Sequence, residues 1–464
     1  MAKLQSEFDI QAALARVERC LGEERPRDAI SDLQAVLTAV PNHPMALCGV
    51  GRVSIQLGDN HAALQVLDLA LAVVPDLAEA RNARGVALQN LGRLDEAEAE
   101  FRYLVDALPD HPGPLANLAA TLAARGEIGP AEAAFEKVLA LKPGDFTASY
   151  NLGLLHLLRG DLEAGWQGFE FRDRASNVGL ARTRSTKPRW QGGTEPDKTL
   201  LVHAEQGLGD NIQFVRFLPM AAERVGRVIL EMPGPLTGLF SRFPSVDQII
   251  PGDGPLPDHD FHIPIMSLPA VLRIAGDEIP WPGPYVAADA DATRRWRERI
   301  EQRAPGMVHV GLIWSGNPAH KRDAERSVPL SLLEPLLKVP GVCFHSLQIG
   351  AAAGQIPHTA FSGPLKLLFR RAYPFTEVAA AIAALDLVIG VDTALAHLAG
   401  AMDRPVWTMI TRVPDWRWML ERSDTPWYPN MRLFRQPTAG DWPSVVENVA
   451  VRLKEFVSSR GDRE

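Results

Sequence analysis

One 34-residue period runs through the first third of this 464-residue sequence. Glycines keep this step (92 − 58 = 126 − 92 = 160 − 126 = 34), at Gly58, Gly92, Gly126 and Gly160. Prolines keep it too, at Pro41, Pro75, Pro109 and Pro143. A chain that holds one period of this length stacks copies of a single supersecondary unit, and each copy packs only against its neighbours. The period therefore predicts a solenoid.

The repeated unit is predicted to be a pair of antiparallel helices. Each repeated glycine ends a first helix, because glycine adopts the left-handed C-cap conformation without strain. Each repeated proline follows a second helix, which proline cannot continue. Ala97 and Phe101 match the Ala-x3-Phe portion of the tetratricopeptide pattern, whose period is also 34 residues. We assign residues 1–171 to a tetratricopeptide solenoid.

A solenoid of this kind presents a concave groove, which predicts a protein or peptide partner. Asn82, Asn117 and Asn151 recur near the starts of the first helices. An amide side chain both donates and accepts hydrogen bonds, so these residues are candidates for holding the backbone of an acceptor protein. Local capping by the asparagines, or a repeat array that serves only as a spacer, remains an alternative.

Composition limits the partners and the compartment. A formal net charge of −8 argues against a nucleic-acid scaffold, which usually shows a basic surface. Cys20, Cys48 and Cys343 are too far apart for a disulfide framework or a zinc pattern, which favours a reducing compartment. The N-terminus does not resemble a signal peptide, and acidic residues interrupt the most apolar stretch. We expect a cytoplasmic protein without a membrane span.

The second half of the chain predicts a different fold. A basic, aperiodic connector covers residues 172–198. Short apolar runs that read as buried strands follow, at 199–204, 227–232, 246–250, 308–314, 342–348, 386–391 and 405–410. Helical stretches separate several of them, which favours parallel sheets. The predicted class is therefore α + α/β, with lobes at 199–288 and 305–440, an interlobe helix at 289–304, and a C-terminal helix and tail at 441–464.

Parallel sheets bind ligands beyond the carboxyl ends of their strands, where helix N-termini face the ligand. The first such segment is the loop after 199–204. Gly207 and Gly209 permit a tight turn and a close approach by a ligand, and Asp210 lies where a helix begins. Asp210 is a candidate general base, and the alternative is a helix N-cap.

A second segment follows the strand at 308–314. Its small, polar and cationic residues suit a phosphate or diphosphate, because backbone N–H groups orient the anion and a lysine supplies a point charge. The candidates for nucleotide-sugar binding here are Ser315, Asn317 and Lys321, together with Gln348 at the end of the strand at 342–348. The alternative is a solvated surface loop.

The third segment, Gly-Val-Asp-Thr-Ala-Leu-Ala-His, carries the strongest signal. Asp392 and Thr393 end a strand, and Ala394 begins a helix of small residues whose N–H groups can receive a phosphate. His397 lies one turn into that helix, beside small neighbours that leave space. The alternative for His397 is a core histidine.

Five of the ten tryptophans fall within residues 407–442. They could stack on a base or a sugar. Packing of the face between the two lobes is an equal alternative.

Residues 199–435 resemble the heptosyltransferase-like (family 9) glycosyltransferases of the GT-B fold. The Gly-Leu-Gly-Asp loop resembles the family loop whose aspartate acts as base, and the segment at 391–401 resembles its donor-phosphate segment. Lys321 resembles the lysine of the family's phosphate loop. Ala394 departs from the family, in which glycine is usual. The fusion to tetratricopeptide repeats is similar in plan to bacterial protein glycosyltransferases, including those that modify flagellin.

The resemblance implies an inverting transferase that moves a sugar from a nucleotide-sugar substrate to a protein, without a metal and without a cofactor. Short Asp-x-Asp matches at 258–260 and 289–291 are not taken as metal sites. One alternative is a transferase acting on lipopolysaccharide or another glycan. Another is a non-catalytic adaptor whose second half is a degenerate binding module.

Overall fold

The computed structural model describes residues 7–175, 178, 183–276, 279–320, 322–358, 365–369 and 372–461. The chain divides into two compact units, Met1–Leu155 and His156–Glu464, and each is described by itself. The division falls inside helix α9 (Phe146–Arg159), and the finer domain bounds expected from the sequence stay predictions.

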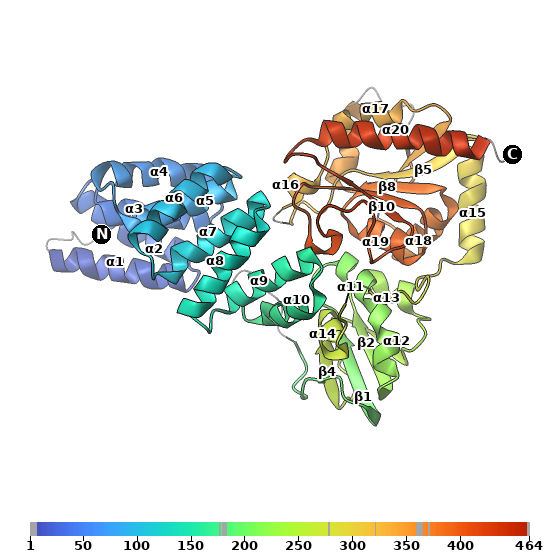
Figure 1. The fold of residues 1–464 in the computed structure, drawn as a ribbon, viewed down its shortest axis with the longest axis horizontal. Helices are drawn as coiled ribbons and strands as arrows, with labels where there is room; N and C mark the ends of the chain where they lie inside the picture. The colour runs from blue at the N-terminus through green and yellow to red at the C-terminus, as the bar shows by residue number, and fades with distance from the viewer. Residues whose placement is uncertain are drawn as a thin grey trace. The chain divides into compact units, whose positions relative to one another are not determined.

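The first unit is built from helical hairpins (Figure 1). The first helices from the second hairpin onward start 34 residues apart (78 − 44 = 112 − 78 = 146 − 112 = 34), so the sequence period is the structural period. The helices are α1 (Glu7–Gly22), α2 (Pro26–Ala39), α3 (Pro44–Gln56), α4 (Asn60–Val73), α5 (Ala78–Asn90), α6 (Leu94–Ala107), α7 (Pro112–Arg125) and α8 (Ile128–Leu141), followed by α9.

The repeated residues have the roles that their chemistry predicts. All four repeated glycines are left-handed, with φ between +74° and +89°, which confirms the predicted C-caps. A Cβ on Gly85 would lie 2.6 Å from the Phe101 ring, so α5 and α6 approach closely because that position has no side chain. Each hairpin buries its repeated small residue, at Ala29, Ala63, Ala97 and Ala131.

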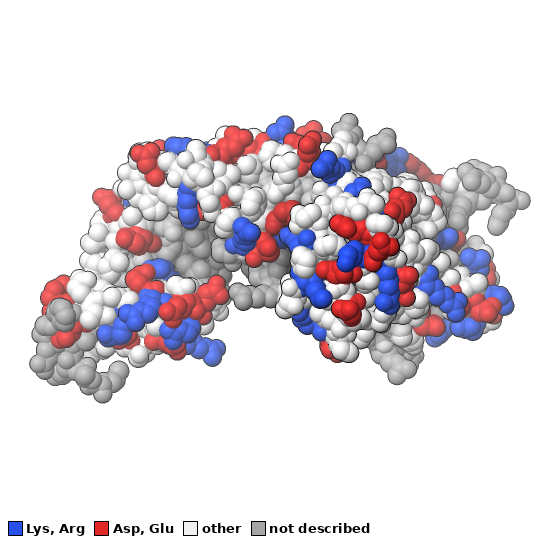
Figure 2. Space-filling view, turned by 90° about the horizontal axis from the view of Figure 1, so that it is seen from below, with Lys and Arg blue, Asp and Glu red and all other residues white. Residues whose placement is uncertain are grey.

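Charged residues on the first unit pair with neighbours of opposite sign. Arg84 donates to Glu100 at 2.6 Å and to Asp68 at 2.7 Å, and Arg81 donates to Glu100 at 3.0 Å. On the face of the molecule seen in Figure 2, acidic and basic side chains are interspersed. Glu100 is buried between Arg81 and Arg84, so its pairs are partly shielded from water.

After the last turn of α9, the second unit contains α10 (Leu162–Phe169) and η1 (Glu170–Asp173) and continues into a four-stranded parallel sheet, the N-lobe. The strand order is β3-β2-β1-β4, so the order reverses between β1 and β4. Its strands are β1 (Glu195–His203), β2 (Val225–Met232), β3 (Gln248–Pro251) and β4 (Phe261–Pro264). Its helices are α11 (Leu208–Phe214), η2 (Val215–Phe217), α12 (Leu218–Ala222), α13 (Gly234–Phe240), η3 (Ile265–Ser267) and α14 (Leu268–Leu272).

Helix α15 (Ala290–Glu301) leads into a six-stranded parallel sheet, the C-lobe, with the order β10-β9-β8-β5-β6-β7. Its strands are β5 (Val308–Ile313), β6 (Val342–Ser346), β7 (Leu365–Leu367), β8 (Leu387–Val391), β9 (Val406–Ile410) and β10 (Met431–Arg435). The order reverses between β5 and β8, and doubly wound sheets bind ligands beyond the carboxyl ends of such a pair.

Helices cover both faces of the C-lobe sheet. α20 (Trp442–Gly461) packs Val446, Val449 and Leu453 into the core formed with the strands, and Figure 1 shows α18 (Phe375–Ala384) and α19 (Ala394–Ala401) on the opposite face. Shorter elements complete the lobe: α16 (Asp323–Arg326), η4 (Leu330–Leu333), α17 (Glu334–Leu337), η5 (Ala351–His358) and η6 (Trp416–Trp418). The predicted class, a helical solenoid followed by parallel α/β lobes, is confirmed.

Part of the predicted connector is packed against the N-lobe. Trp190 is buried, and its backbone N–H donates to the His262 carbonyl at 2.9 Å, beside the edge strand β4. Among the helices that the structure describes, none is long and apolar enough to cross a membrane.

Candidate functional site

The Gly-Leu-Gly-Asp loop joins β1 to α11 through a strained turn. Gln206 is left-handed (φ +57°), a conformation that costs a non-glycine residue about 1–3 kcal/mol and that clusters at functional sites. Side-chain hydrogen bonds of Asp210 and Asn211 hold the turn. The Gly207 N–H donates to Asp210 Oδ2 at 2.8 Å, and Asn211 Nδ2 donates to the Glu205 carbonyl at 3.0 Å. Asp210 is thus the third residue of α11, and its carboxylate reaches back to the helix start.

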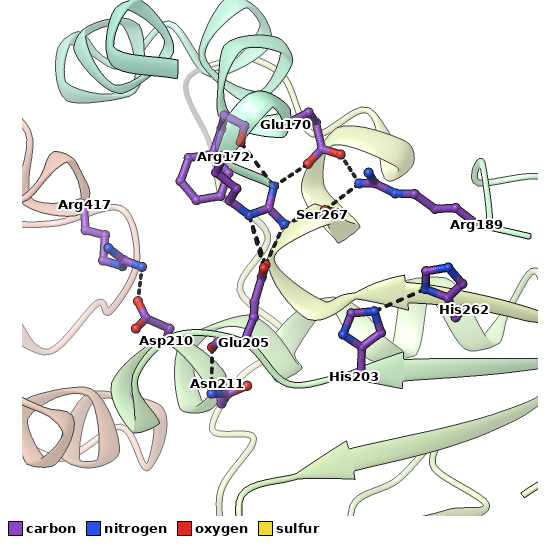
Figure 3. A network of polar contacts seen from close by, with 11 residues as sticks. Glu170, Arg172, Arg189, His203, Glu205, Asp210, Asn211, His262, Ser267 and Arg417 are labelled. Atoms are coloured by element: carbon purple, nitrogen blue, oxygen red, sulfur yellow. Dashed lines mark hydrogen bonds and ion pairs between the residues drawn. The ribbon is translucent and has the colours of Figure 1, made fainter. Parts of the chain in front are cut away.

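The other oxygen of Asp210 accepts a hydrogen bond from Arg417 Nη2, a residue of the C-lobe (Figure 3). Arg417 is buried, and it also donates to Asp415 at 2.8 Å and to Gln213 Oε1 at 2.6 Å. Although burial opposes it, the Asp415 and Asp210 carboxylates raise the pKa of Arg417. The predicted base is therefore ion-paired across the two lobes in this conformation.

Helix α19 begins beyond β8, at the reversal point of the C-lobe sheet. Thr393 is its N-cap residue in extended conformation, yet its side chain makes no capping hydrogen bond. Among the described residues, the buried Thr393 Oγ1 has no hydrogen-bond partner. A helix start with an unsatisfied hydroxyl suits an anion, because the first N–H groups and the helix dipole both favour negative charge.

His397 lies inside a packed cluster. Its Nδ1 is 2.9 Å from the Tyr428 hydroxyl, and its ring stacks on Trp418 with centroids 5.3 Å apart. Burial lowers the pKa of His397 to about 3, so the imidazole is neutral. The sequence predicted open space beside His397 because its neighbours in the helix are small. In the structure the rings of Trp418 and Tyr428, which come from a distant part of the sequence, fill that space.

Asp392 approaches the opposite side of the same imidazole, with Oδ1 3.7 Å from His397 Nε2. Burial, together with the neighbouring Asp415 carboxylate, raises the pKa of Asp392 to about 6. A carboxyl group whose pKa is raised towards neutrality is found both at functional sites and in structural ion-pair networks.

Gly209 brings the two lobes into direct contact. A Cβ at this position would lie 2.8 Å from His397 Cδ2 and 3.3 Å from Ala394 Cα. The predicted close approach at this glycine is thus made by α19 in this structure, and an approach by a ligand stays a prediction. Asp210, the next residue, is therefore close to the start of α19.

The loop after β5 contains the other predicted donor residues. Gln348 is buried, and its Oε1 accepts hydrogen bonds from the N–H groups of Trp314 (3.2 Å) and Ser315 (3.0 Å), so it orders this loop. Ser315 Oγ accepts from Ser327 at 3.2 Å. Asn317 Oδ1 accepts from the Ala319 N–H at 3.1 Å, within its own turn.

Lys321 lies outside the described residues. Ser315 follows β5 and Thr393 follows β8, so the sheet brings these two segments to the same reversal point.

Part of the aromatic segment packs the face between the lobes. The Trp416 ring lies 5.8 Å from Trp427 and 6.4 Å from Phe214 of α11. The packing alternative thus accounts for Trp416 and Trp427, whereas Trp407 and Trp442 lie in the core of the C-lobe itself.

Arg417, which is part of this segment, was missed by the sequence reasoning. The available signal was the position of Arg417 between two tryptophans, which suggests that it is buried. A buried guanidinium needs acidic partners, so a carboxylate was to be expected beside it.

A second buried arginine also escaped the sequence reasoning. Arg172 of η1 donates to Glu205 Oε1 at 2.6 Å, to Glu170 at 2.9 Å and to Ser267 at 2.6 Å (Figure 3). Glu205 ends the turn that precedes Gly207, and burial raises its pKa. Arg172 therefore fixes the base of the Gly-Leu-Gly-Asp loop from the segment that follows α10.

A hollow of about 570 Å³ lies elsewhere, beside α15, and Arg294, Arg297 and Arg404 are among its lining residues. It includes none of the predicted site residues.

In the first unit, Asn117 Nδ2 donates to Asn82 Oδ1 at 2.9 Å, so two of the three predicted acceptor-binding asparagines bond to one another across neighbouring repeats. Asn151 lies on α9.

Two families match the sequence. Residues 373–448 match glycosyltransferase family 9 (heptosyltransferase), a range that contains Thr393, His397 and Arg417 but not Asp210. Tetratricopeptide repeats match residues 14–76, 51–112 and 117–165.

Among curated proteins, protein FlbA of Caulobacter vibrioides is 28% identical over 457 residues, which cover 94% of this chain and 71% of that protein. DnaJ homolog subfamily C member 3 of Mus musculus is 30% identical over 101 residues, 22% of this chain and 20% of that protein. Among solved structures, MamA from Desulfovibrio magneticus RS-1 is 19% identical with a TM-score of 0.30, covering 37% of this chain and 94% of that chain. The chain combines tetratricopeptide repeats with a C-terminal glycosyltransferase family 9 domain.

Proposed function

We propose that this chain is an inverting glycosyltransferase that moves a sugar from a nucleotide-sugar to a protein held by its repeats. The observation that carries the proposal is the start of α19. Within the described part of the chain, the buried Thr393 Oγ1 has no partner, and it lies at a helix N-terminus at the reversal point of the sheet. An anion there would satisfy the hydroxyl and the first N–H groups together.

The donor phosphates are proposed to bind at Thr393 and Ala394, with Ser315, Asn317 and Lys321 from the loop after β5. In the described structure, Asp392, Gln348 and His397 already bond to or pack against protein groups, so their proposed part is to shape this pocket. Donors aimed at the leaving phosphate would stabilise the charge that develops there in the transition state.

Asp210 is the proposed general base. Its ion pair with Arg417 would have to open before it acts, so donor binding would control when the base is available. In the paired state both Asp210 oxygens already accept hydrogen bonds, Oδ1 from Arg417 and Oδ2 from the Gly207 N–H. An incoming diphosphate would compete for Arg417, because guanidinium groups bind phosphate oxygens in a bidentate manner. The released carboxylate would then accept the proton of the acceptor hydroxyl as that oxygen attacks the anomeric carbon, which inverts the configuration.

The repeats are the proposed acceptor site, since tetratricopeptide repeats generally bind peptides. Their attachment to the transferase would raise the local concentration of a docked protein. Flagellin is the acceptor that the resemblance in domain plan suggests.

The test is co-expression of the full-length chain with candidate acceptor proteins, flagellin among them, followed by intact-mass measurement. We expect a mass increase of one or more sugar units, and Asp210→Asn should abolish it. Asn82→Ala combined with Asn117→Ala should reduce the modification without changing donor affinity. Transfer only to a glycan would favour the lipopolysaccharide alternative. A chain that binds no nucleotide-sugar at all would favour the adaptor.

A further inference from the structure

Three metal-ligating side chains meet on one face of the C-lobe sheet, away from the proposed donor site. His309 of β5 pairs in register with Cys343 of β6, and His345 lies two residues further along β6. Paired residues on parallel strands share a face, and so do residues two apart on one strand. The three side chains are buried, and one ligand atom from each lies within 4.8 Å of the others.

The distance between the two imidazoles fits a shared ion. His309 Nδ1 and His345 Nε2 are 3.1 Å apart. Two nitrogens bound to one tetrahedral zinc at about 2.0–2.1 Å would be about 3.3 Å apart, and a thiolate sulfur would lie about 3.6 Å from each. The nitrogens are thus nearly in place, and the thiol sulfur, within 4.8 Å of both, has at most about 1 Å to move.

A carboxylate orients one of the ligands. Oε2 of Glu301, the last residue of α15, lies 3.0 Å from Nε2 of His309. This contact places the N–H of His309 on Nε2 and turns the Nδ1 lone pair towards His345 and Cys343. Histidine ligands of metal sites usually donate their second N–H to a carboxylate in this manner.

The second histidine, His345, has one ring nitrogen without a hydrogen-bond partner among the described residues. This nitrogen is Nδ1, and it is buried.

We propose that His309, Cys343 and His345 bind one transition-metal ion of the zinc class. When the ion binds, the Cys343 thiol loses its proton and the proton on His345 Nε2 moves to Nδ1 of the same ring. Glu301 is a positioning residue for His309. These ligands stand in the strands β5 and β6, whereas Ser315 and Gln348 lie beyond the carboxyl ends of the same two strands. The ion would therefore tie the two strands together rather than touch the donor.

The test uses the full-length chain after removal of metals with a chelator, titrated with Co²⁺ and then with Zn²⁺. We expect one Co²⁺ per chain, with the near-ultraviolet charge-transfer band of a cobalt–thiolate bond, and displacement of Co²⁺ by Zn²⁺. Cys343→Ser should remove the band. Glu301→Gln should keep the band and weaken affinity about ten- to hundredfold.

Two matched controls come from the same chain. Cys48 is another buried cysteine, and His203 with His262 forms another imidazole pair, 3.2 Å apart between Nε2 and Nδ1. Cys48→Ser and His262→Asn should leave the band unchanged. Absence of the band in the unmodified chain would overturn the proposal without relying on any variant. Persistence of the band in Cys343→Ser would overturn the proposal as well. His309 and His345 would then be only a hydrogen-bonded pair of neutral imidazoles.

Discussion

Arg417 donates a hydrogen bond to the carboxylate of Asp210, a residue 207 positions earlier in the chain. This ion pair joins the loop after β9 to the loop after β1, so it links the two lobes of the second unit. Both oxygens of the candidate base are thus occupied in this conformation, Oδ1 by Arg417 and Oδ2 by the Gly207 N–H. Activity would then depend on a ligand that separates the pair.

Asp210→Asn should keep the fold and lose sugar transfer by at least about a hundredfold, the lower range for a general base. Asparagine can still accept from the Gly207 N–H, and Arg417 keeps Asp415 as a partner. Intact-mass assays measure transfer, and calorimetry with the donor checks that binding persists. Unchanged turnover in this variant would remove Asp210 from the mechanism.

Thr393→Val should weaken nucleotide-sugar binding by about ten- to hundredfold, since a hydrogen bond to a charged group contributes about 1.5–3 kcal/mol. Thr408→Val is the matched control. Among the described residues the buried Thr408 Oγ1 also has no partner, but it lies inside β9. Calorimetric titration of both variants measures the difference. Equal affinities would exclude the Thr393 hydroxyl as a donor contact.

Asp392→Asn should change how stability depends on pH. The pKa of Asp392 is raised from 3.8 to about 6, so the folded chain binds this proton more tightly than the unfolded chain. The stabilisation of the folded chain by this bound proton is full below about pH 4 and is lost as the pH rises through 6. The free energy of unfolding of the variant, relative to the unmodified chain, should therefore rise between pH 4 and 6, by at most about 3 kcal/mol.

Tryptophan fluorescence during urea unfolding measures this effect selectively, because all ten tryptophans lie at position 166 or later and report on the second unit alone. A difference between the two proteins that stays flat from pH 4 to 7 would contradict the raised pKa.

Gly209→Ala should destabilise the second unit by about 1–3 kcal/mol, the usual range for overpacking. Its Cβ would enter the space of His397, which cannot retreat because it stacks on Trp418. Gly234→Ala is the matched control, because a Cβ there meets nothing within 4 Å. The same fluorescence measurement compares the two. Equal stabilities would show that the lobes separate in solution, so that Gly209 is not against α19.

The repeat unit was largely predictable because its signals are local. A left-handed C-cap at Gly92 and a break at Pro109 depend on the residue itself and its own helix. The seven predicted strands were also found, since fully buried parallel strands are continuous apolar runs. The edge strands β4, β7 and β10 were missed, because they are short or lie within proline-rich and aromatic segments that obscure the apolar run.

The sequence by itself determined the repeat period, the two sheets and the loops after β1, β5 and β8 where polar groups gather, because each of these follows from residues near one another in the chain. Only the tertiary structure decided what those loops meet. Arg417 pairs with Asp210, Gly209 lies on α19, and His309 joins Cys343 and His345. These contacts join residues 34 to 207 positions apart, and long-range packing rather than local propensity selects them.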